Sequence, residues 1–196
     1  MAVELPLWRS MLFVPANVQR FVDKAHERNA DAIILDLEDS VPLAEKAAAR
    51  TCIHSAAKSV SRAGADVVVR INSTLRLAAA DLDVAVDAAV TAICIPKVSS
   101  AEQLQWISEA LDELELEKGL SAGHTRLIGL IESVAALPKL ADIAVSTPRL
   151  AALILGSEDF SASAGMEPVA DGLLYPNQQI VFAARSAGIM PLGFVG

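Results

Sequence analysis

The sequence has little of what marks secreted, membrane-spanning or nucleic-acid-binding proteins. Its 196 residues include two cysteines, Cys52 and Cys94, too few for a disulfide framework, so we expect a reduced, cytoplasmic setting. No apolar run approaches the roughly 18 residues of a membrane span, and the first residues lack the apolar core of a signal peptide. With 16 basic and 24 acidic residues, the net charge of −8 argues against nucleic acid and anionic membranes as main partners.

Two common catalytic patterns are also missing. No G-x-G-x-x-G turn follows the first apolar run, which leads instead into Pro15, Ala16 and Asn17, so dinucleotide binding is disfavoured. His26 and His54 are predicted to lie mid-helix, and His124 is predicted to precede a strand. None is expected at the carboxyl end of a strand, which argues against Ser-His-Asp catalysis, Cys-His catalysis and histidine-based zinc sites.

Short apolar runs alternate with Ala-rich segments of helical spacing. The runs are continuous and rich in Val, Ile and Leu, as in parallel strands that are buried on both faces. They cover residues 11–14, 32–37, 67–71, 92–95, 127–131, 151–155 and 190–195. Helices are predicted between them over residues 17–29, 43–63, 78–90, 101–118, 134–144 and 176–187, with Pro176 in a first helical turn. The pattern predicts an α/β protein with a parallel sheet, either a barrel or a doubly wound sheet.

The number of strands favours one of these architectures. A TIM (β/α)8 barrel usually takes about 250 residues, and a sheet of seven strands would leave two unpaired edges. We therefore expect a TIM-type barrel of about seven strands whose C-terminal strand and helix are missing, rather than a genuine short barrel or an open sheet. Since no linker or low-complexity tract interrupts the sequence, we expect a single domain over residues 1–196.

Polar side chains lie at or just beyond the ends of five consecutive apolar runs. In chain order they are Asp36 and Glu38, Arg70 and Asn72, Lys97, Glu132, and then Glu158 and Asp159. In a parallel barrel the carboxyl ends of the strands share one face, where such folds hold their active sites. Each charge could instead begin a solvated loop or cap a helix, which is the interpretation we keep for Asp39, Asp23 and Glu102. A shared site explains five consecutive strand ends better, because burying unpaired charges costs about several kcal/mol per ion.

These residue types indicate a particular chemistry. Two carboxylates with otherwise open coordination suit Mg²⁺, which keeps several water or substrate oxygens. The guanidinium of Arg70 suits bidentate capture of a carboxylate or of a polarised carbonyl. Together they describe a site that chelates an oxoacid and stabilises an enolate-like oxyanion.

The strand-end motifs resemble those of the citrate lyase beta-subunit-like acyl-CoA lyases of the HpcH-HpaI aldolase superfamily. The motifs are RSMLFVP at 9–15, ILDLEDSV at 34–41, VRIN at 69–72, IPKV at 95–98, LIES at 130–133 and GSED at 156–159. The resemblance implies a (β/α)8 barrel, Mg²⁺ dependence, CoA-thioester substrates and homotrimers or larger homo-oligomers. It departs at Ala16, where the family often has glycine, and in a C-terminal segment that family chains carry beyond this sequence.

The resemblance also implies roles for individual residues. Glu132 and Asp159 match the metal ligands, and Arg70 matches the substrate-binding arginine, with Glu132 and Lys97 also expected at the substrate. Asp36, Glu38 and Lys97 are expected to support them, and we predict Asp36 and Glu38 to be catalytic together with Arg70. The general base is open between a metal-bound water, Glu38 and a group of the missing segment.

The expected function is a Mg²⁺-dependent carbon–carbon lyase. It would cleave a 3-hydroxy-acyl-CoA such as citryl-, citramalyl- or malyl-CoA to an acyl-CoA and a 2-oxoacid. Two alternatives are open. Lys97 could form a Schiff base with a carbonyl substrate, although a structural ion pair with Glu38 or Asp36 is the favoured role for it. The chain could also be a non-catalytic or complex-dependent subunit that acts with an acyl-carrier-protein thioester.

Overall fold

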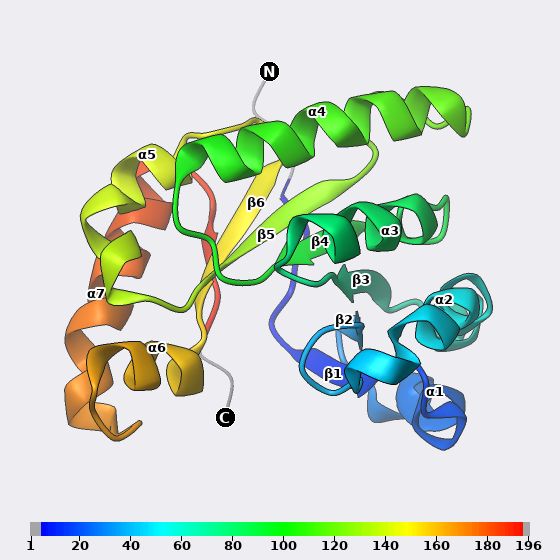
Figure 1. The fold of residues 1–196 in the computed structure, drawn as a ribbon, viewed down its shortest axis with the longest axis horizontal. Coiled ribbons are helices and arrows are strands. Elements are labelled where there is room, and N and C mark those ends of the chain that lie inside the picture. Colours follow the sequence, from blue (N-terminus) through cyan, green and yellow to red (C-terminus); the bar gives the residue numbers. More distant parts are fainter. Residues whose placement is uncertain (1–4, 194–196) are drawn as a thin grey trace. The chain divides into compact units, whose positions relative to one another are not determined.

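The computed structural model describes residues 5–193 and contains strands and helices in alternation (Figure 1). The chain divides into two compact units, and each is described by itself. The N-terminal unit comprises Pro6–Cys94 and Leu111–Arg126, and the C-terminal unit comprises Leu5 with residues 95–110 and 127–193. The single domain expected over residues 1–196 stays a prediction.

The sheet of the N-terminal unit consists of parallel strands that follow one another in chain order. They are β1 (Met11–Pro15), β2 (Ala32–Asp36), β3 (Asp66–Arg70) and β4 (Ala92–Ile95). The unit includes β4 as far as Cys94. The register pairs Pro15 with Asp36 and Asp36 with Arg70, so the carboxyl ends of β1, β2 and β3 lie level. Every residue of β2 is buried, as its continuous apolar run predicts.

Helices lie between the strands of this unit, and the longest of those wholly within it, α2, buries an apolar face. They are α1 (Gln19–Ala25), η1 (His26–Arg28), η2 (Leu43–Glu45), α2 (Lys46–Val60), η3 (Ser61–Ala63), α3 (Leu75–Ala85) and the second part of α4 (Ala101–Glu117). On α2, Ala49, Ile53, Ala56 and Val60 recur at helical spacing and are buried. Full burial of a side chain the size of Ile53 stabilises a fold by about 1.5–3 kcal/mol. Helix α2 packs between α1 and α3, which holds the strands of this unit in place.

The C-terminal unit repeats the same alternation. Its strands are β5 (Arg126–Ile131, in this unit from Leu127), β6 (Leu150–Leu155) and β7 (Met190–Pro191), and its helices are η4 (Val134–Lys139), α5 (Leu140–Ala144), α6 (Ser157–Ala164), α7 (Ala170–Ser186) and the first part of α4 (Ala101–Glu117). The strands are parallel, and α7 packs on β6, β7 and α5. Gly129 makes room for β6, since a Cβ there would lie 2.8 Å from Leu153 Cδ2.

The structure corrects several predicted boundaries. Helix α3 begins at Leu75 and ends at Ala85, because Val86 already has an extended backbone. Helix α7 begins at Ala170, so Pro176 lies inside the helix and the prediction of a first-turn proline is wrong. Helix α6 was not predicted. The last predicted strand, residues 190–195, is observed as Met190–Pro191, and its residues 194 and 195 lie outside the described residues.

The predicted fold class is confirmed in its coarser form. In residues 5–193, seven strands alternate with helices as an α/β protein whose parallel strands are consistent with a TIM-barrel-like fold. Within the same residues, no helix combines the length and apolar character that a membrane crossing requires.

Candidate active site

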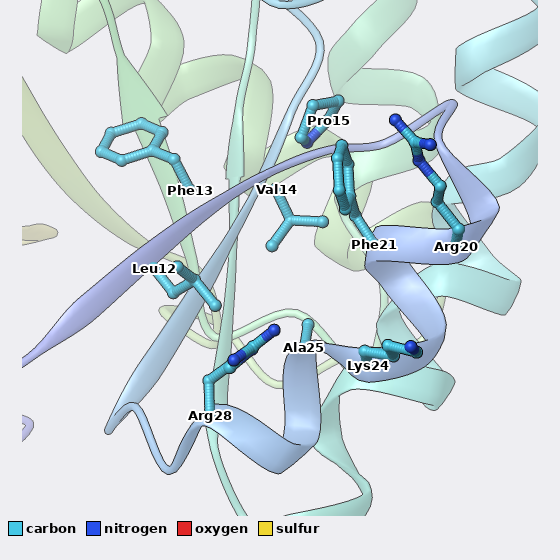
Figure 2. A pocket seen from close by; sticks show the side chains of 9 residues that line it. All are labelled: Leu12, Phe13, Val14, Pro15, Arg20, Phe21, Lys24, Ala25 and Arg28. Atoms are coloured by element: carbon cyan, nitrogen blue, oxygen red, sulfur yellow. The ribbon is translucent and has the colours of Figure 1, made fainter.

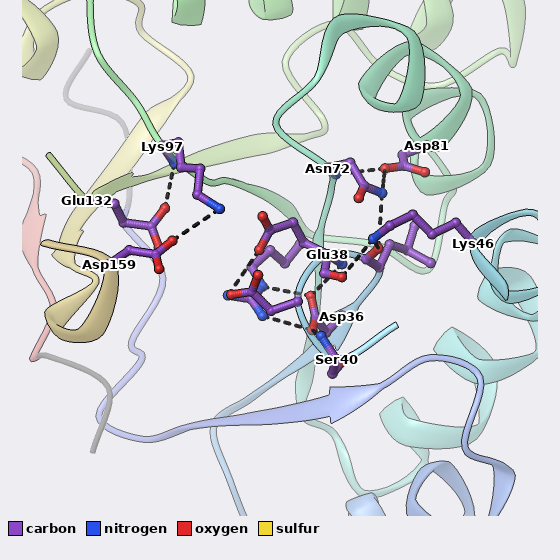
Figure 3. A network of polar contacts seen from close by, with 12 residues as sticks. Asp36, Glu38, Ser40, Lys46, Asn72, Asp81, Lys97, Glu132 and Asp159 are labelled. Atoms are coloured by element: carbon purple, nitrogen blue, oxygen red, sulfur yellow. Dashed lines mark hydrogen bonds and ion pairs between the residues drawn. The ribbon is translucent and has the colours of Figure 1, made fainter. Parts of the chain in front are cut away.

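A bidentate ion pair joins the carboxyl ends of β2 and β3 in the N-terminal unit (Figure 3). Arg70 Nε donates to Asp36 Oδ1 over 2.7 Å, and an Arg70 Nη donates to Asp36 Oδ2 over 2.8 Å. The two residues are partners in the parallel register, which is why their side chains meet. Both are nearly enclosed, with side-chain exposures of 2% for Asp36 and 12% for Arg70. Such charge-assisted fork contacts are among the strong, directional hydrogen bonds of proteins.

Asp36 also organises the loop that follows β2. Its carboxylate accepts the backbone N–H of Glu38 at 2.8 Å and that of Ser40 at 2.9 Å, and it accepts the Ser40 hydroxyl. Burial raises the pKa of Asp36, but the hydrogen bonds and charge of Arg70, with those from Ser40 and Glu38, outweigh it and leave the pKa below its ordinary value. An ionised, fully engaged carboxylate orients its neighbours. The catalytic role predicted for Asp36 stays a prediction, and these contacts favour positioning.

Arg70 keeps one side of its guanidinium turned toward further acids. One of its Nη atoms lies 3.8 Å from Glu38 Oε2 and 3.6 Å from Asp39 Oδ2, which is beyond direct hydrogen-bond length. The central carbon of the guanidinium, Cζ, lies 4.9 Å from the centre of the Phe13 ring. Burial lowers the pKa of Arg70, but the hydrogen bond and the charge of Asp36 raise the pKa by more than burial lowers it. The guanidinium therefore stays charged. Two donors are committed to Asp36, so a substrate oxygen would have to bind at the remaining edge, which faces Glu38 and Asp39.

Two further buried side chains, Lys46 and Asn72, hydrogen-bond to the backbone of the loop that follows β2. Lys46 Nζ donates to the carbonyls of Leu37 at 2.8 Å and of Glu38 at 2.7 Å. Asn72 Nδ2 donates to the Leu37 carbonyl at 3.0 Å and to Asp81 Oδ2 at 2.6 Å. Sequence reasoning found Asn72 and missed Lys46 and Asp81. For Asp81 the sequence offered one signal, an acidic residue among the alanines of the segment that forms α3.

Asp81, the acid that contacts Asn72, has an exposed fraction of 0%. Besides the Asn72 side chain it accepts the Asn72 backbone N–H at 2.7 Å, and its other oxygen accepts Arg50 Nε at 2.6 Å. The chain of contacts from Arg50 through Asp81 and Asn72 to the loop is therefore continuous. It anchors the Leu37 carbonyl, one residue before Glu38, through contacts that are largely shielded from water.

The predicted metal ligands lie together in the C-terminal unit, around Lys97 (Figure 3). The Lys97 backbone N–H donates to Glu132 Oε2 at 2.6 Å, and Lys97 Nζ pairs with Asp159 Oδ2 at 3.1 Å. Glu132 follows the end of β5 and is buried, whereas Asp159 lies in the first turn of α6 and is about half exposed. Glu158, the neighbouring acid of that turn, is exposed.

Gly156, between β6 and α6, makes the room that Glu132 occupies. A Cβ on Gly156 would lie 2.5 Å from Glu132 Cγ and 2.7 Å from its Oε1. Its φ of −84° is accessible to any residue, so the reason for glycine here is the close approach of the carboxylate. The glycine that precedes the GSED acids therefore seats the carboxylate of the LIES motif.

The donor set suits a hard divalent cation that keeps most of its own ligands. Within residues 5–193 no cluster of three or more His, Cys, Asp or Glu side chains forms a complete cage for a metal. Mg²⁺ commonly binds through one or two carboxylates and completes its octahedron with water or substrate oxygens. A buried carboxylate from Glu132 and a more exposed one from Asp159 therefore fit Mg²⁺ better than a metal that needs a full protein cage.

A wide hollow of about 840 Å³ lies along β1 and α1 of the N-terminal unit (Figure 2). Phe13 and Phe21 contribute apolar surface, and the exposed Arg20, Lys24 and Arg28 contribute positive charge from one helical segment. A hollow with this lining suits a ligand that carries phosphate groups beside an apolar or ring-shaped part.

The sequence matches the HpcH/HpaI aldolase/citrate lyase family over residues 9–196. It is 34% identical over 186 residues to citrate lyase subunit beta of Leuconostoc mesenteroides subsp. cremoris, covering 93% of this chain and 62% of that protein. It is 30% identical over 200 residues to mitochondrial citramalyl-CoA lyase of Rattus norvegicus, covering 95% of this chain and 59% of the relative. The chain thus spans about three fifths of the length of these curated relatives.

The fold is also similar to solved structures. Protein CitE of Mycobacterium tuberculosis, in complex with magnesium and acetoacetate, superposes with a TM-score of 0.77 at 27% identity. The superposition covers 99% of this chain and 76% of the CitE chain.

Proposed function

Because the chain belongs to the HpcH/HpaI aldolase/citrate lyase family, we propose that it is part of a Mg²⁺-dependent carbon–carbon lyase with a TIM-type barrel. The substrate class is a 3-hydroxy-acyl thioester of the citryl-, citramalyl- or malyl-CoA type, cleaved to an acyl thioester and a 2-oxoacid. The similarity to citrate lyase subunit beta and to citramalyl-CoA lyase supports this substrate class. The magnesium and acetoacetate bound to CitE support Mg²⁺ as the ion and an oxoacid as the product. We further propose a cytoplasmic homotrimer or larger homo-oligomer.

The observation that carries the proposal is the grouping of Glu132 and Asp159 around Lys97. We assign the two carboxylates to Mg²⁺. When bound, this ion supplies Lewis-acid polarisation of the substrate's hydroxyl and carboxylate oxygens. The contribution of the chain is to seat Glu132 against Gly156 and to present Asp159 from the first turn of α6.

We assign Arg70 to the thioester end of the substrate. In the cleavage, the substrate hydroxyl loses its proton, its electron pair forms the carbonyl of the 2-oxoacid, and the carbon–carbon bond breaks. The electrons of that bond move onto the thioester oxygen as an enolate, which then takes up a proton at carbon. The outward edge of the Arg70 guanidinium is suited to stabilise that oxyanion, because Asp36 holds the side chain rigidly from the other edge. Glu38, fixed beside Arg70, stays our predicted catalytic carboxylate.

The hollow along β1 and α1 is the site that we assign to the phosphates of a CoA thioester. Arg20, Lys24 and Arg28 offer three positive charges over apolar surface, as a phosphorylated nucleotide requires. Replacing Lys24 and Arg28 together by Gln should raise KM for the CoA thioester and leave the affinity for free pyruvate unchanged.

A second candidate is a subunit that works only within a complex, on a thioester of an acyl-carrier protein. The similarity to a citrate lyase beta subunit favours it. One comparison of rates distinguishes the two candidates. The first predicts turnover of a free CoA thioester, and the second predicts turnover only when an acyl-carrier protein carries the same acyl group. A third, the Schiff-base aldolase, is disfavoured because Lys97 Nζ lies 3.1 Å from Asp159 Oδ2 and would have to leave that carboxylate to attack a carbonyl.

The proposed function is tested by following 2-oxoacid release from citryl-, citramalyl- and malyl-CoA with Mg²⁺ and with excess chelator. Asp159→Asn should lower kcat/KM by at least about 100-fold, since even residues outside the ligand sphere change metal-site activity by about 10–100-fold. Glu158→Gln is the matched control, because it removes an exposed acid from the same helical turn. Turnover that is undiminished in chelator, or equal losses in both variants, would refute the assignment.

A further inference from the structure

Lys97 has a backbone conformation that its side chain does not favour. Its φ of 54° lies in the left-handed region, which within residues 5–193 only one other non-glycine residue, Asn29, shares. Asparagine enters this region readily, whereas an unbranched side chain such as lysine seldom does. Glycine or asparagine would satisfy the backbone of this turn better. The presence of lysine therefore needs an explanation that involves its ammonium group.

The turn at Lys97 aims two consecutive backbone N–H groups. The N–H of Lys97 donates to Glu132, and the N–H of Val98 returns to the Leu130 carbonyl at 3.0 Å. These contacts anchor the backbone on β5 and leave the side chain to extend toward α6. Its ammonium lies 3.1 Å from Asp159 Oδ2. One residue thereby contacts both carboxylates that the proposed function assigns to the metal, one through its backbone and the other through its side chain.

We propose that the Lys97 ammonium is the resident cation of this acidic pair in the metal-free protein, and that a divalent cation has to displace it from Asp159. The inference rests on the proposed function, because it takes Glu132 and Asp159 as the metal ligands. The Asp159 oxygen that pairs with Lys97 has to release the ammonium before it coordinates a cation directly. The displaced ammonium is then a positive charge close to the bound ion. Both effects weaken metal binding, so Lys97 sets the affinity below what the two carboxylates alone would give.

The exposure of the pair sets the size of the effect. The side chains of Lys97 and Asp159 are 43% and 42% exposed. Ion pairs this open contribute up to about 1 kcal/mol, which corresponds to about a fivefold change in an equilibrium constant. Removing the ammonium should therefore tighten divalent cation binding by about fivefold at low salt. At about 1 M salt, where the screening length falls to about 3 Å, the difference should shrink.

The experiment titrates the purified protein with Mn²⁺ alone and counts free Mn²⁺ by electron paramagnetic resonance. Lys97→Met removes the charge and keeps an unbranched side chain and the backbone N–H. Lys97→Gln should give the same result, and Lys97→Arg should retain the wild-type affinity. Lys58→Met is the charge-matched control, because Lys58 is an exposed lysine on α2 of the N-terminal unit. Circular dichroism confirms that each variant is folded.

Tighter Mn²⁺ binding by the Met and Gln variants at position 97, with a wild-type value for the Lys58 variant, supports the inference. Equal or weaker binding by the Met and Gln variants, while Glu132→Gln and Asp159→Asn lose Mn²⁺, overturns the inference and leaves the metal site of the proposed function intact. Mn²⁺ binding that neither Glu132→Gln nor Asp159→Asn changes overturns the metal site itself, and the inference with it.

Discussion

Replacing Gly156 by alanine tests whether the missing side chain at position 156 provides the space that the Glu132 side chain occupies. The added methyl group would lie 2.5 Å from Glu132 Cγ and 3.0 Å from its Cδ. Because Cγ is close to the backbone, the whole side chain has to rotate to relieve such a contact. Its hydrogen bond with the Lys97 N–H at 2.6 Å would then be lost. The φ of Gly156 is ordinary, so the effect is steric and has no contribution from backbone strain.

The expected magnitude follows from two terms. Overpacking a filled site costs about 1–3 kcal/mol, and leaving a shielded N–H without its acceptor costs about 1–3 kcal/mol. Since rotation of Glu132 relieves part of the first term, we expect Gly156→Ala to lower the free energy of unfolding by about 2–4 kcal/mol. Mn²⁺ affinity should fall by at least about tenfold, because one of the two proposed ligands has moved.

The assay pairs urea denaturation with Mn²⁺ titration on the same preparation. Gly172→Ala in α7 is the control, because a Cβ there meets only side-chain atoms at 3.4 Å or more, the flexible end of Met166 and a methyl group of Val169. It should leave stability unchanged or raise it by up to about 1 kcal/mol, the usual gain from alanine in a helix. Wild-type stability and wild-type Mn²⁺ affinity in Gly156→Ala would refute the proposed seat.

Three further predictions concern the polar network of the N-terminal unit. Arg70→Lys keeps the charge and loses the two-pronged contact with Asp36, so kcat/KM should fall about 100-fold in steady-state kinetics while the fold persists. Asp81→Asn leaves the charge of the partly buried Arg50 uncompensated and should cost about 3 kcal/mol in urea denaturation; a loss below about 1 kcal/mol would mean that the network is not structural. The pKa of Asp36 is depressed, so its ionised form stabilises the folded state fully above the unfolded-chain value near 3.8 and loses that contribution as pH falls toward the folded value. Stability curves of wild type and Asp36→Asn should therefore converge below about pH 4, and parallel curves there would contradict the depressed pKa.

The parallel strands were predictable because strands that are buried on both faces have continuous apolar runs. The run at residues 32–37 became β2 with every residue buried. The meeting of Asp36 and Arg70 was also predictable in kind, since parallel register brings the carboxyl ends of neighbouring strands together. The boundaries of α3 and the start of α7 were not, because Ala-rich and Pro-containing segments satisfy several helix registers and tertiary packing selects one.

The support behind the site was beyond sequence reasoning for a different reason. Lys46 acts through backbone carbonyls, which leave no trace in residue types. Asp81 contacts Arg50 from a separate helix, and such a long-range pair has no local pattern. The resemblance implied Lys97 as a supporting residue, but its link to both Glu132 and Asp159 depends on a left-handed turn that only the structure displays.

The central claim is that Glu132 and Asp159 share one divalent cation. A crystal soaked with Mn²⁺ and pyruvate tests it most directly, read by the anomalous signal of the metal. The account predicts one peak within about 2.0–2.3 Å of a carboxylate oxygen from each residue, the remaining positions filled by water and pyruvate oxygens, and Lys97 Nζ withdrawn from Asp159. A peak coordinated by only one of the two carboxylates, with the Lys97–Asp159 ion pair unbroken, would contradict it.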